Sequence, residues 1–252
     1  MPSLPARRIG DGPRLALVHG FTQTGGSWDP VATILAADHE VVTVDAPGHG
    51  AASAIETGLV QGAELLAEAA GAATYVGYSM GGRYCLHTAL YAPDAVLGLV
   101  LVSATGGIDD ADERAARRAA DERLADRIGE IGVAAFVDEW LAQPLFATLD
   151  AAAADRDGRL VNTAQGLASS LRLAGTGTQL ALWDDLADID VPVLVLAGEL
   201  DAKFRAAGER LAAAIGPNAT YAVVPGAGHT AHLEQPDAFL AILRPWLATH
   251  GL

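Results

Sequence analysis

Three side chains of the sequence could together activate a serine. Ser79 is the middle residue of Gly-Tyr-Ser-Met-Gly at 77–81, which follows an apolar run and opens a helix-like stretch at 82–90. A serine at such a strand–turn–helix junction has a strained backbone, and its Oγ is exposed beside the free N–H groups of the helix. Asp201 and His229 each follow a later apolar run, so the chain presents serine, acid and histidine in that order. In a Ser–His–Asp triad the imidazole takes the serine proton and the carboxylate orients the imidazole.

The sequence offers one alternative candidate for the acid of this triad. Glu199 lies two residues before Asp201, at the end of the same predicted strand. Asp201 is further into the loop, so we expect Asp201 to reach His229. His232 lies three residues after His229 and suggests a metal pair. No third ligand follows at the usual spacing, so no metal site is predicted.

Apolar runs and helical spacing predict the elements that position these residues. Strands are expected in the run that ends at 76 and at residues 14–18, 40–45, 96–102, 191–197 and 221–224. Helices are expected at residues 28–37, 59–70, 82–90, 204–215 and 237–250. Unbroken apolar strands that alternate with helices indicate an α/β fold with a mostly parallel central sheet, flanked by helices on both faces.

Residues 106–183 break that alternation, because they contain no convincing strand. Helical patterns dominate instead, at residues 112–128, 133–140 and 166–173. We expect this region to form a helical cap over the carboxyl edge of the sheet, inserted into a core made of residues 1–105 and 184–252. The region holds eight arginines, and pairing with nearby Asp and Glu is expected for more than half of them.

The composition describes one large globular domain without a disulfide. Of 252 residues, 51% are hydrophobic and 19% are charged, which is enough apolar material for a substantial core. With Cys85 as the single cysteine, no intrachain bridge can form, and we expect it to pack as a small hydrophobe. A formal net charge of −15 opposes binding to nucleic acid or to an anionic membrane, but not to an anionic substrate held by local arginines. No run reads as a membrane span or a signal peptide, so a cytoplasmic location is expected.

The order serine, acid, histidine, each beyond a strand, resembles that of the α/β-hydrolase fold. In that arrangement the loop after the strand at 14–18 supplies one N–H of an oxyanion hole, here from Phe21. Met80, which follows the serine, supplies the other N–H. His19 in the same loop and His49 in a later turn are expected to be structural rather than catalytic.

Longer motifs narrow the resemblance to one branch of that fold. They are residues 19–21, 45–50, 77–83 and 201–204, together with two segments of the predicted cap, 139–146 and 166–179. Together they resemble the 2-succinyl-6-hydroxy-2,4-cyclohexadiene-1-carboxylate synthases of menaquinone and phylloquinone biosynthesis, over almost the whole chain. The resemblance implies a lyase that eliminates pyruvate from 2-succinyl-5-enolpyruvyl-6-hydroxy-3-cyclohexene-1-carboxylate. It implies no metal and no organic cofactor.

The resemblance also implies roles for individual residues. Ser79, activated by His229 and oriented by Asp201, would act as a general base on a carbon acid. A small-molecule substrate with several carboxylates needs fixed cations, and guanidinium groups match carboxylates well. Arg83 is the main candidate because it lies one helical turn beyond Ser79, and its alternative is a pair with a structural carboxylate. The other expected substrate contacts are Arg117, Arg159, Trp140 and Tyr78.

Two other classes of function stay open on the sequence. A serine carboxylesterase or a carbon–carbon bond hydrolase would use the same triad covalently, and the arginines of the predicted cap disfavour it. A non-catalytic binding protein on this fold usually lacks a member of the triad, whereas all three members are present here. Arg172, in the second cap motif, faces either the pocket or a neighbouring helix. No oligomeric state is predicted.

Overall fold

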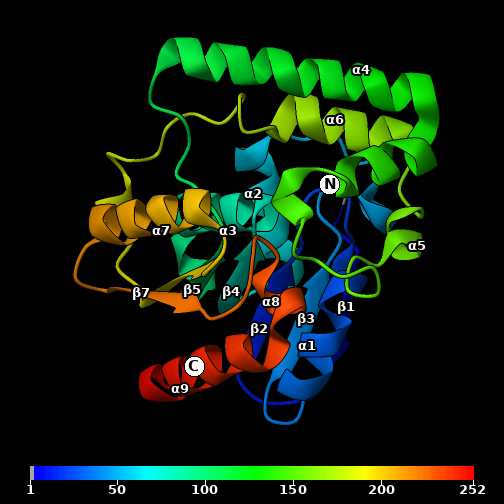
Figure 1. Ribbon diagram of the computed structural model, residues 1–252. Coiled ribbons are helices and arrows are strands. Elements are labelled where there is room, and N and C mark those ends of the chain that lie inside the picture. The colour runs from blue at the N-terminus through cyan, green and yellow to red at the C-terminus, as the bar shows by residue number, and fades with distance from the viewer. Residues whose placement is uncertain (1–2) are drawn as a thin grey trace.

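A seven-stranded sheet forms the centre of the protein, which is described over residues 3–252 by a computed structural model (Figure 1). The strand order is β1-β3-β2-β4-β5-β6-β7, in which β1 pairs antiparallel with β3 and all the other neighbours are parallel. The strands are β1 (Ala6–Ile9), β2 (Arg14–Val18), β3 (Glu40–Val44), β4 (Ala73–Tyr78), β5 (Val96–Val102), β6 (Val193–Gly198) and β7 (Ala219–Val224). The predicted mostly parallel sheet is confirmed.

Helices cover both faces of this sheet, because alternate residues of each strand point to opposite sides. Leu15 and Leu17 of β2 pack in one apolar cluster with α1 (Asp29–Leu35) and α9 (Pro236–His250). Ala16 and Val18 point the other way and pack in a second cluster. The helices of that second cluster are α2 (Leu59–Ala70), α3 (Met80–Tyr91) and α7 (Ala202–Ile215).

Three short elements were not predicted. β1 contains the adjacent Arg7 and Arg8, and three of its four residues are exposed. It forms the edge of the sheet, where charged side chains protect an unpaired strand from further pairing, so it lacks the apolar signature of the inner strands. The helices α5 (Arg156–Arg159) and α8 (Ala231–Glu234) have four residues each, which is too short for a helical period to show.

Residues 106–183, called the helical segment below, contain no strand along their fully described length. Their longest element is α4 (Ala111–Leu141), which packs against α6 (Ala164–Ala174) beyond one edge of the sheet (Figure 1). The two helices predicted at 112–128 and 133–140 are therefore parts of α4. The backbone leaves helical geometry between them at Gly132, where φ is 76° and ψ is 168°. Within residues 3–252 no helix is both long enough and apolar enough to cross a membrane.

The topology brings two loops together at the carboxyl edge of the sheet. β2 and β4 are neighbours in the sheet, although the chain passes through β3 between them. After β2 the chain turns to β3 on one side, and after β4 it turns to β5 on the other. Parallel sheets bind ligands where successive connections diverge in this way. The loop that contains Phe21 and the turn that contains Ser79 therefore meet at this point.

Candidate active site

Ser79 occupies the turn between β4 and α3 in a conformation that few residues adopt. Its φ is 52° and its ψ is −107°, and its N–H donates to Val102 O at 2.8 Å. The flanking glycines allow the close packing of this turn. A Cβ on Gly77 would overlap the backbone of Gly81, and a Cβ on Gly81 would overlap Val18 O at the end of β2. Glycine at both positions therefore allows a turn that presents the serine Oγ beside the start of α3.

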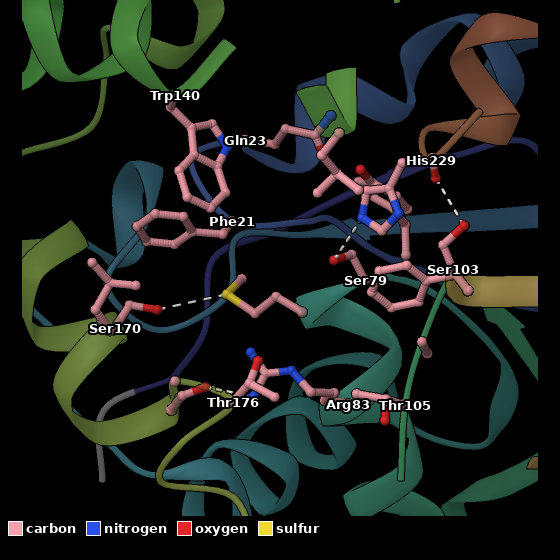
Figure 2. A pocket seen from close by; sticks show the side chains of 18 of the residues that line it. Phe21, Gln23, Ser79, Arg83, Ser103, Thr105, Trp140, Ser170, Thr176 and His229 are labelled. Carbon is pink, nitrogen blue, oxygen red and sulfur yellow. Dashed lines mark hydrogen bonds between the residues drawn. The ribbon is translucent and has the colours of Figure 1, made fainter. Parts of the chain in front are cut away.

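The structure brings Ser79, His229 and Asp201 into one hydrogen-bonded chain. His229 Nδ1 lies 2.7 Å from Asp201 Oδ2, and His229 Nε2 lies 3.3 Å from Ser79 Oγ (Figure 2). Asp201 also caps α7, because its Oδ1 accepts from Phe204 N at 3.1 Å. Glu199 accepts from Gly226 N instead and makes no contact of this kind with the histidine. With Nδ1–H donating to Asp201, the imidazole has its Nε2 lone pair free to accept the serine proton.

Two side chains outside the triad hold the loop that carries His229. Ser103, directly after β5, donates its hydroxyl to His229 O at 2.8 Å (Figure 2). Glu234 accepts from the N–H groups on both sides of the histidine, Gly228 N at 2.7 Å and Thr230 N at 2.8 Å. The backbone around the imidazole is therefore fixed at three points. No sequence motif pointed to Ser103 or Glu234, because their contacts are made through space.

The loop after β2 leaves the Phe21 N–H free. Gly20 N donates to Gln23 Oε1 at 2.9 Å, and Thr22 N donates to His49 Nε2 at 3.2 Å. Neither Phe21 N nor Met80 N donates to any acceptor within the described part of the chain. Met80 is the first residue of α3, so its N–H has no partner inside the helix. Two free N–H groups are what an oxyanion hole requires, so the geometry is compatible with the role predicted for Phe21 and Met80.

The two loop histidines hold backbone groups in place. His19 Nδ1 donates to Gly20 O at 2.8 Å, and its Nε2 accepts from Ala46 N at 3.0 Å. His49 Nδ1 donates to Pro47 O at 3.0 Å, while its Nε2 accepts from the Thr22 N–H. Burial is the largest influence on both rings, and it lowers the pKa of His19 to about 4 and that of His49 to about 3. Both rings are therefore neutral at pH 7 and fix backbone groups by hydrogen bonds, in agreement with the structural role expected of them.

A pocket opens over Ser79 and is lined by the core and by the helical segment. Figure 2 shows Ser79 and His229 facing one another, with Phe21 and Trp140 towards one end of the pocket and Arg83 towards the other. The rings of Phe21 and Trp140 meet edge to face, with centroids 5.1 Å apart. Tyr78 lines the pocket as well, with its hydroxyl 3.1 Å from Thr230 Oγ1, and burial raises the pKa of this phenol. The wall is therefore mainly aromatic at the Trp140 end.

Two arginines in the pocket are buried without a carboxylate in direct contact. Arg83 is 7% exposed and donates to Ala174 O at 2.6 Å. Arg159 is 3% exposed and donates to Ala154 O at 2.8 Å and to Thr22 Oγ1. Within residues 3–252, no carboxylate oxygen lies within 4 Å of either guanidinium group. Burial lowers the pKa of both groups, that of Arg83 to about 10, so Arg83 stays charged at neutral pH.

The other two arginines named from the sequence have carboxylate partners. Arg117 lines the pocket, but its Nε donates to the buried Asp121 at 2.8 Å. Arg172 does not line the pocket. It bridges Glu122 and Asp126 on α4, at 2.7 and 2.6 Å, and it is half-exposed. Of the two placements open for Arg172, the structure therefore shows the one against a neighbouring helix.

His232 is placed away from any metal-binding arrangement. Its ring stacks on Trp28 with centroids 4.0 Å apart, and neither ring nitrogen has a hydrogen-bond partner in the described chain. No group of three or more His, Cys, Asp or Glu side chains is arranged to hold a metal ion anywhere in residues 3–252. Cys85 is fully buried in the apolar cluster under α3, where burial raises the pKa of its thiol. Its expected role as a packed hydrophobe is confirmed.

Two further residues line the pocket although the sequence did not predict a functional role for them. Gln23 braces the loop of Phe21 through its Oε1, and it lines the pocket beside that loop. Lys203 lines the pocket from the first turn of α7. It belongs to the motif at 201–204, so the sequence carried a signal, but only the structure shows that its side chain borders the pocket.

Comparison with protein families and curated proteins places this arrangement among known enzymes. The model of the Alpha/beta hydrolase family matches residues 15–242. The 2-succinyl-6-hydroxy-2,4-cyclohexadiene-1-carboxylate synthase of Serratia proteamaculans (strain 568) is 32% identical to this chain, over 96% of this chain and 95% of its own length. A protein of Bacillus subtilis (strain 168) that carries the same name provisionally is 38% identical, over 92% of this chain and 89% of its own length.

Solved structures give a similar result for the fold. The structure of MenH from S. aureus superimposes with a TM-score of 0.88 and 29% identity, and the match covers all of both chains. A thermophilic esterase from Thermogutta terrifontis, solved with malate bound, has a TM-score of 0.85 and 25% identity over 99% of this chain and 94% of its own. Overall shape alone therefore does not separate a synthase from an esterase, and the residues of the pocket have to make that distinction.

Proposed function

The chain belongs to the alpha/beta hydrolase family and, within it, to the 2-succinyl-6-hydroxy-2,4-cyclohexadiene-1-carboxylate synthases, and from this membership we propose how its residues carry out the reaction. The substrate is 2-succinyl-5-enolpyruvyl-6-hydroxy-3-cyclohexene-1-carboxylate, which loses pyruvate to give the cyclohexadiene product. The enzyme is a carbon–oxygen lyase built on a hydrolase fold. Ser79, His229 and Asp201 supply its base, and buried arginines hold the substrate.

The observation that carries this proposal is the pair of guanidinium groups without counter-ions, those of Arg83 and Arg159. Each is nine-tenths or more buried, and each is bonded only to neutral oxygens. A buried charge without an opposite charge is costly, so a fold keeps such groups where a ligand supplies the missing charge. Both line the pocket that contains Ser79. A substrate with three carboxylates fits this pocket, whereas a neutral ester leaves both arginines unpaired.

The reaction needs a proton to leave a ring carbon and a carbon–oxygen bond to break. Ser79 Oγ passes its own proton to His229 Nε2, 3.3 Å away, and accepts the proton from the ring carbon. The electron pair left on carbon forms the new ring double bond, and the bond to the enolpyruvyl oxygen breaks. The leaving oxygen takes the proton held on His229, and the enol released in this way rearranges to pyruvate. The triad returns to its starting protonation state, so no oxidant, reductant or cofactor is consumed.

Other residues of the pocket support this step. The N–H groups of Phe21 and Met80 stabilise the negative charge that develops on the substrate as the proton leaves. Trp140 and Tyr78 form the walls against which the ring is held. Arg117 adds a third cation, which its bond to Asp121 partly neutralises. We further propose that residues 106–183 act as a cap, since they contribute Arg117, Trp140 and Arg159 to the pocket from outside the sheet.

An esterase is the second candidate, because the triad and the oxyanion donors would serve acyl transfer equally well. The similar fold of the Thermogutta terrifontis esterase keeps this alternative open. The two mechanisms differ at Ser79. A nucleophile forms an acyl-serine during turnover, whereas a general base is never covalently modified.

The decisive experiment compares two reactions of the purified enzyme. Pyruvate release from the proposed substrate is followed with lactate dehydrogenase, in parallel with hydrolysis of p-nitrophenyl acetate. We expect pyruvate release with a kcat/KM at least a hundredfold above that for the ester, and an unmodified mass for the protein during steady-state turnover of the proposed substrate. An acyl-serine adduct in that mass spectrum, or rapid ester turnover without pyruvate release, would show that the chain is a hydrolase.

We also propose the ligand class of the site and the location of the protein. The ligand of the site is a small-molecule polycarboxylate. A cytoplasmic location suits an enzyme of cofactor biosynthesis, and fractionation of cells that express the full-length protein would test it.

A further inference from the structure

The sequence contains a single lysine, Lys203, among fifteen arginines. That lysine lines the pocket above Ser79, and its side chain is exposed to solvent. An ammonium group is a compact point charge on a flexible stem, whereas a guanidinium group is a planar fork that favours fixed geometry. All the remaining Lys or Arg positions of the chain are arginines. The position at which the chain uses the ammonium group is the border of the active site.

No carboxylate in the described part of the protein pairs with Lys203. Within the described residues no carboxylate oxygen lies within 4 Å of its Nζ, whereas Arg210 on the same helix pairs with Asp109 and stacks on Trp183. The Lys203 ammonium lies 5.5 Å from the centroid of the Phe204 ring. That ring packs on the catalytic imidazole of His229, with centroids 4.4 Å apart. The Phe204 ring therefore contacts both the ammonium group and the catalytic imidazole.

Local stability does not explain the lysine either. Lys203 is the second residue of α7, two residues after the helix cap Asp201, and the first turn of α7 contains no acidic residue. The N-terminus of a helix carries a partial positive charge, so a cation in the first turn is unfavourable there. A residue that breaks a local rule without compensation in the fold is expected at a functional site.

We propose that Lys203 is the entrance cation of the active site, which captures a carboxylate of the incoming substrate before the buried arginines bind it. This inference rests on the proposed function, since it concerns the route of the same polycarboxylate. The protein has a formal net charge of −15, so a trianion approaching most of its surface is repelled. An exposed cation at the pocket border offsets that repulsion at the one place where association is productive. Its flexible stem lets the ammonium group follow the substrate inwards.

The test compares Lys203→Gln with Lys203→Arg and with Arg123→Gln. Arg123 is exposed on α4, outside the pocket, and has no ion pair in the described structure, so its substitution changes the net charge by the same amount. At low ionic strength we expect Lys203→Gln to lower kcat/KM for pyruvate release about threefold to tenfold while kcat stays within about twofold. The loss should shrink as salt screens the charge, Lys203→Arg should retain most of the wild-type value, and Arg123→Gln should match the wild type.

Three results would overturn the inference. One is an unchanged kcat/KM for Lys203→Gln at low salt. Another is an equal loss in Arg123→Gln, which would make the effect one of net charge. The third is a fall in kcat with unchanged KM, which would place the lysine in the chemical step. All three presuppose that the wild type releases pyruvate. A wild type that releases none would refute the proposed function itself, so the two failures are distinguishable.

Discussion

The core and the helical segment (residues 106–183) both contribute residues to the site, but different interactions hold those residues in place. In the core, Ser79, Asp201 and His229 stand at strand ends beside two large clusters of nearly inaccessible apolar side chains. In the helical segment one small apolar cluster joins α4 to α6, and exposed ion pairs such as that of Arg172 with Glu122 cover the outside. Dense packing leaves a side chain few alternative positions, whereas exposed ion pairs contribute little to the stability of the fold. The reacting groups thus lie where the structure is most constrained.

Polar contacts join the two regions at several places, and two of them involve arginines proposed to bind substrate. Arg83 of the core donates to Ala174 at the end of α6. Arg159 donates to Thr22 in the loop of the oxyanion donors, and Asn162 Nδ2 donates to Thr22 O at 2.6 Å. A substrate carboxylate that binds Arg83 or Arg159 would therefore bind a side chain that also connects the two regions. We therefore expect substrate binding and the position of the helical segment to be coupled through these side chains.

The largest expected effect comes from the core, at the serine itself. Ser79→Gly should lower kcat for pyruvate release by roughly 10³- to 10⁴-fold, because it removes the general base. The same change should raise the free energy of unfolding by about 1 kcal/mol, since glycine adopts a φ of 52° without strain. Urea denaturation measures the change in unfolding free energy, and the pyruvate assay measures the change in kcat. Ser79→Ala is the control, with the same loss of activity but no gain in stability. A less stable Ser79→Gly protein would contradict the claim of strain.

The next largest effect is expected at the joint between the regions. Arg83→Ala should lower kcat/KM by about thirtyfold to several thousandfold, which corresponds to roughly 2–5 kcal/mol for a charge pair lost from a desolvated site. The matched control is Arg172→Gln, which removes an exposed arginine of the helical segment and should leave activity within about twofold. Steady-state kinetics and thermal unfolding of both variants are the measurements. Near-normal turnover by a well-folded Arg83→Ala protein would exclude its role in substrate binding.

The same contrast explains how much of the structure could be predicted from the sequence. β2 and β5 lie at the predicted residues, and α2 matches its prediction as well, because inner strands and amphipathic helices carry a clear apolar period. The meeting of Ser79, Asp201 and His229 followed from their positions at strand ends of a parallel sheet. Edge strand β1 was missed because its residues are charged and exposed.

Contacts between distant loops could not be predicted in this way. Glu234 binds the N–H groups around His229, and Gln23 binds the N–H of Gly20, yet neither contact follows from a spacing or a period. In the helical segment, Arg117, Arg159 and Arg172 look alike in sequence. They differ in the structure because one has a buried carboxylate, one has neutral partners only, and one lies on the outer surface. Three-dimensional packing alone separates them.

Acid should weaken the core and spare the helical segment. His19, His49, His87 and His232 are buried, and burial lowers their pKa values to about 4, 3, 4 and 3. All seven histidines of the chain lie outside residues 106–183. A buried histidine with a lowered pKa contributes stability that is fully present above the unfolded value of about 6.5 and is lost as the pH falls towards the folded value. We expect a loss of a few kcal/mol in unfolding free energy between pH 7 and pH 5.5.

Urea denaturation at several pH values measures this loss, and His232→Phe identifies one contribution to it. Both ring nitrogens of His232 lack partners in the described chain, and its ring stacks on Trp28, so phenylalanine keeps the packing and removes the titration. The variant should lose about 1 kcal/mol less than the wild type over the same pH range. An identical pH dependence in the two proteins would show that His232 does not titrate on unfolding.

The smallest effect is expected within the helical segment, where two glycines of α4 make a matched pair. Gly129 has ordinary helical geometry, whereas Gly132 has a φ of 76° and a ψ of 168°, a region that is nearly restricted to glycine. Apart from the adjacent residues and the backbone of α4 itself, no atom of the described chain lies within 4 Å of a Cβ at either position, so alanine meets no obstacle from the rest of the fold. Only backbone preference distinguishes them. Gly129→Ala should stabilise the protein by about 0.5–1 kcal/mol, and Gly132→Ala should destabilise it by about 1 kcal/mol or more.

The two substitutions also test whether the break at Gly132 matters for binding. Trp140 lies eight residues beyond the break and packs on Phe21, so an alanine that drew α4 into one continuous helix would displace the indole from the pocket wall. We therefore expect KM for pyruvate release to rise about threefold in Gly132→Ala, with kcat nearly unchanged, because the triad stands on the core and does not move. Gly129→Ala should leave KM at the wild-type value. If both variants kept that value while differing in stability as expected, the break would serve the packing of the helical segment alone. A fall in kcat for Gly132→Ala would instead show that a change in the helical segment is transmitted to the triad in the core.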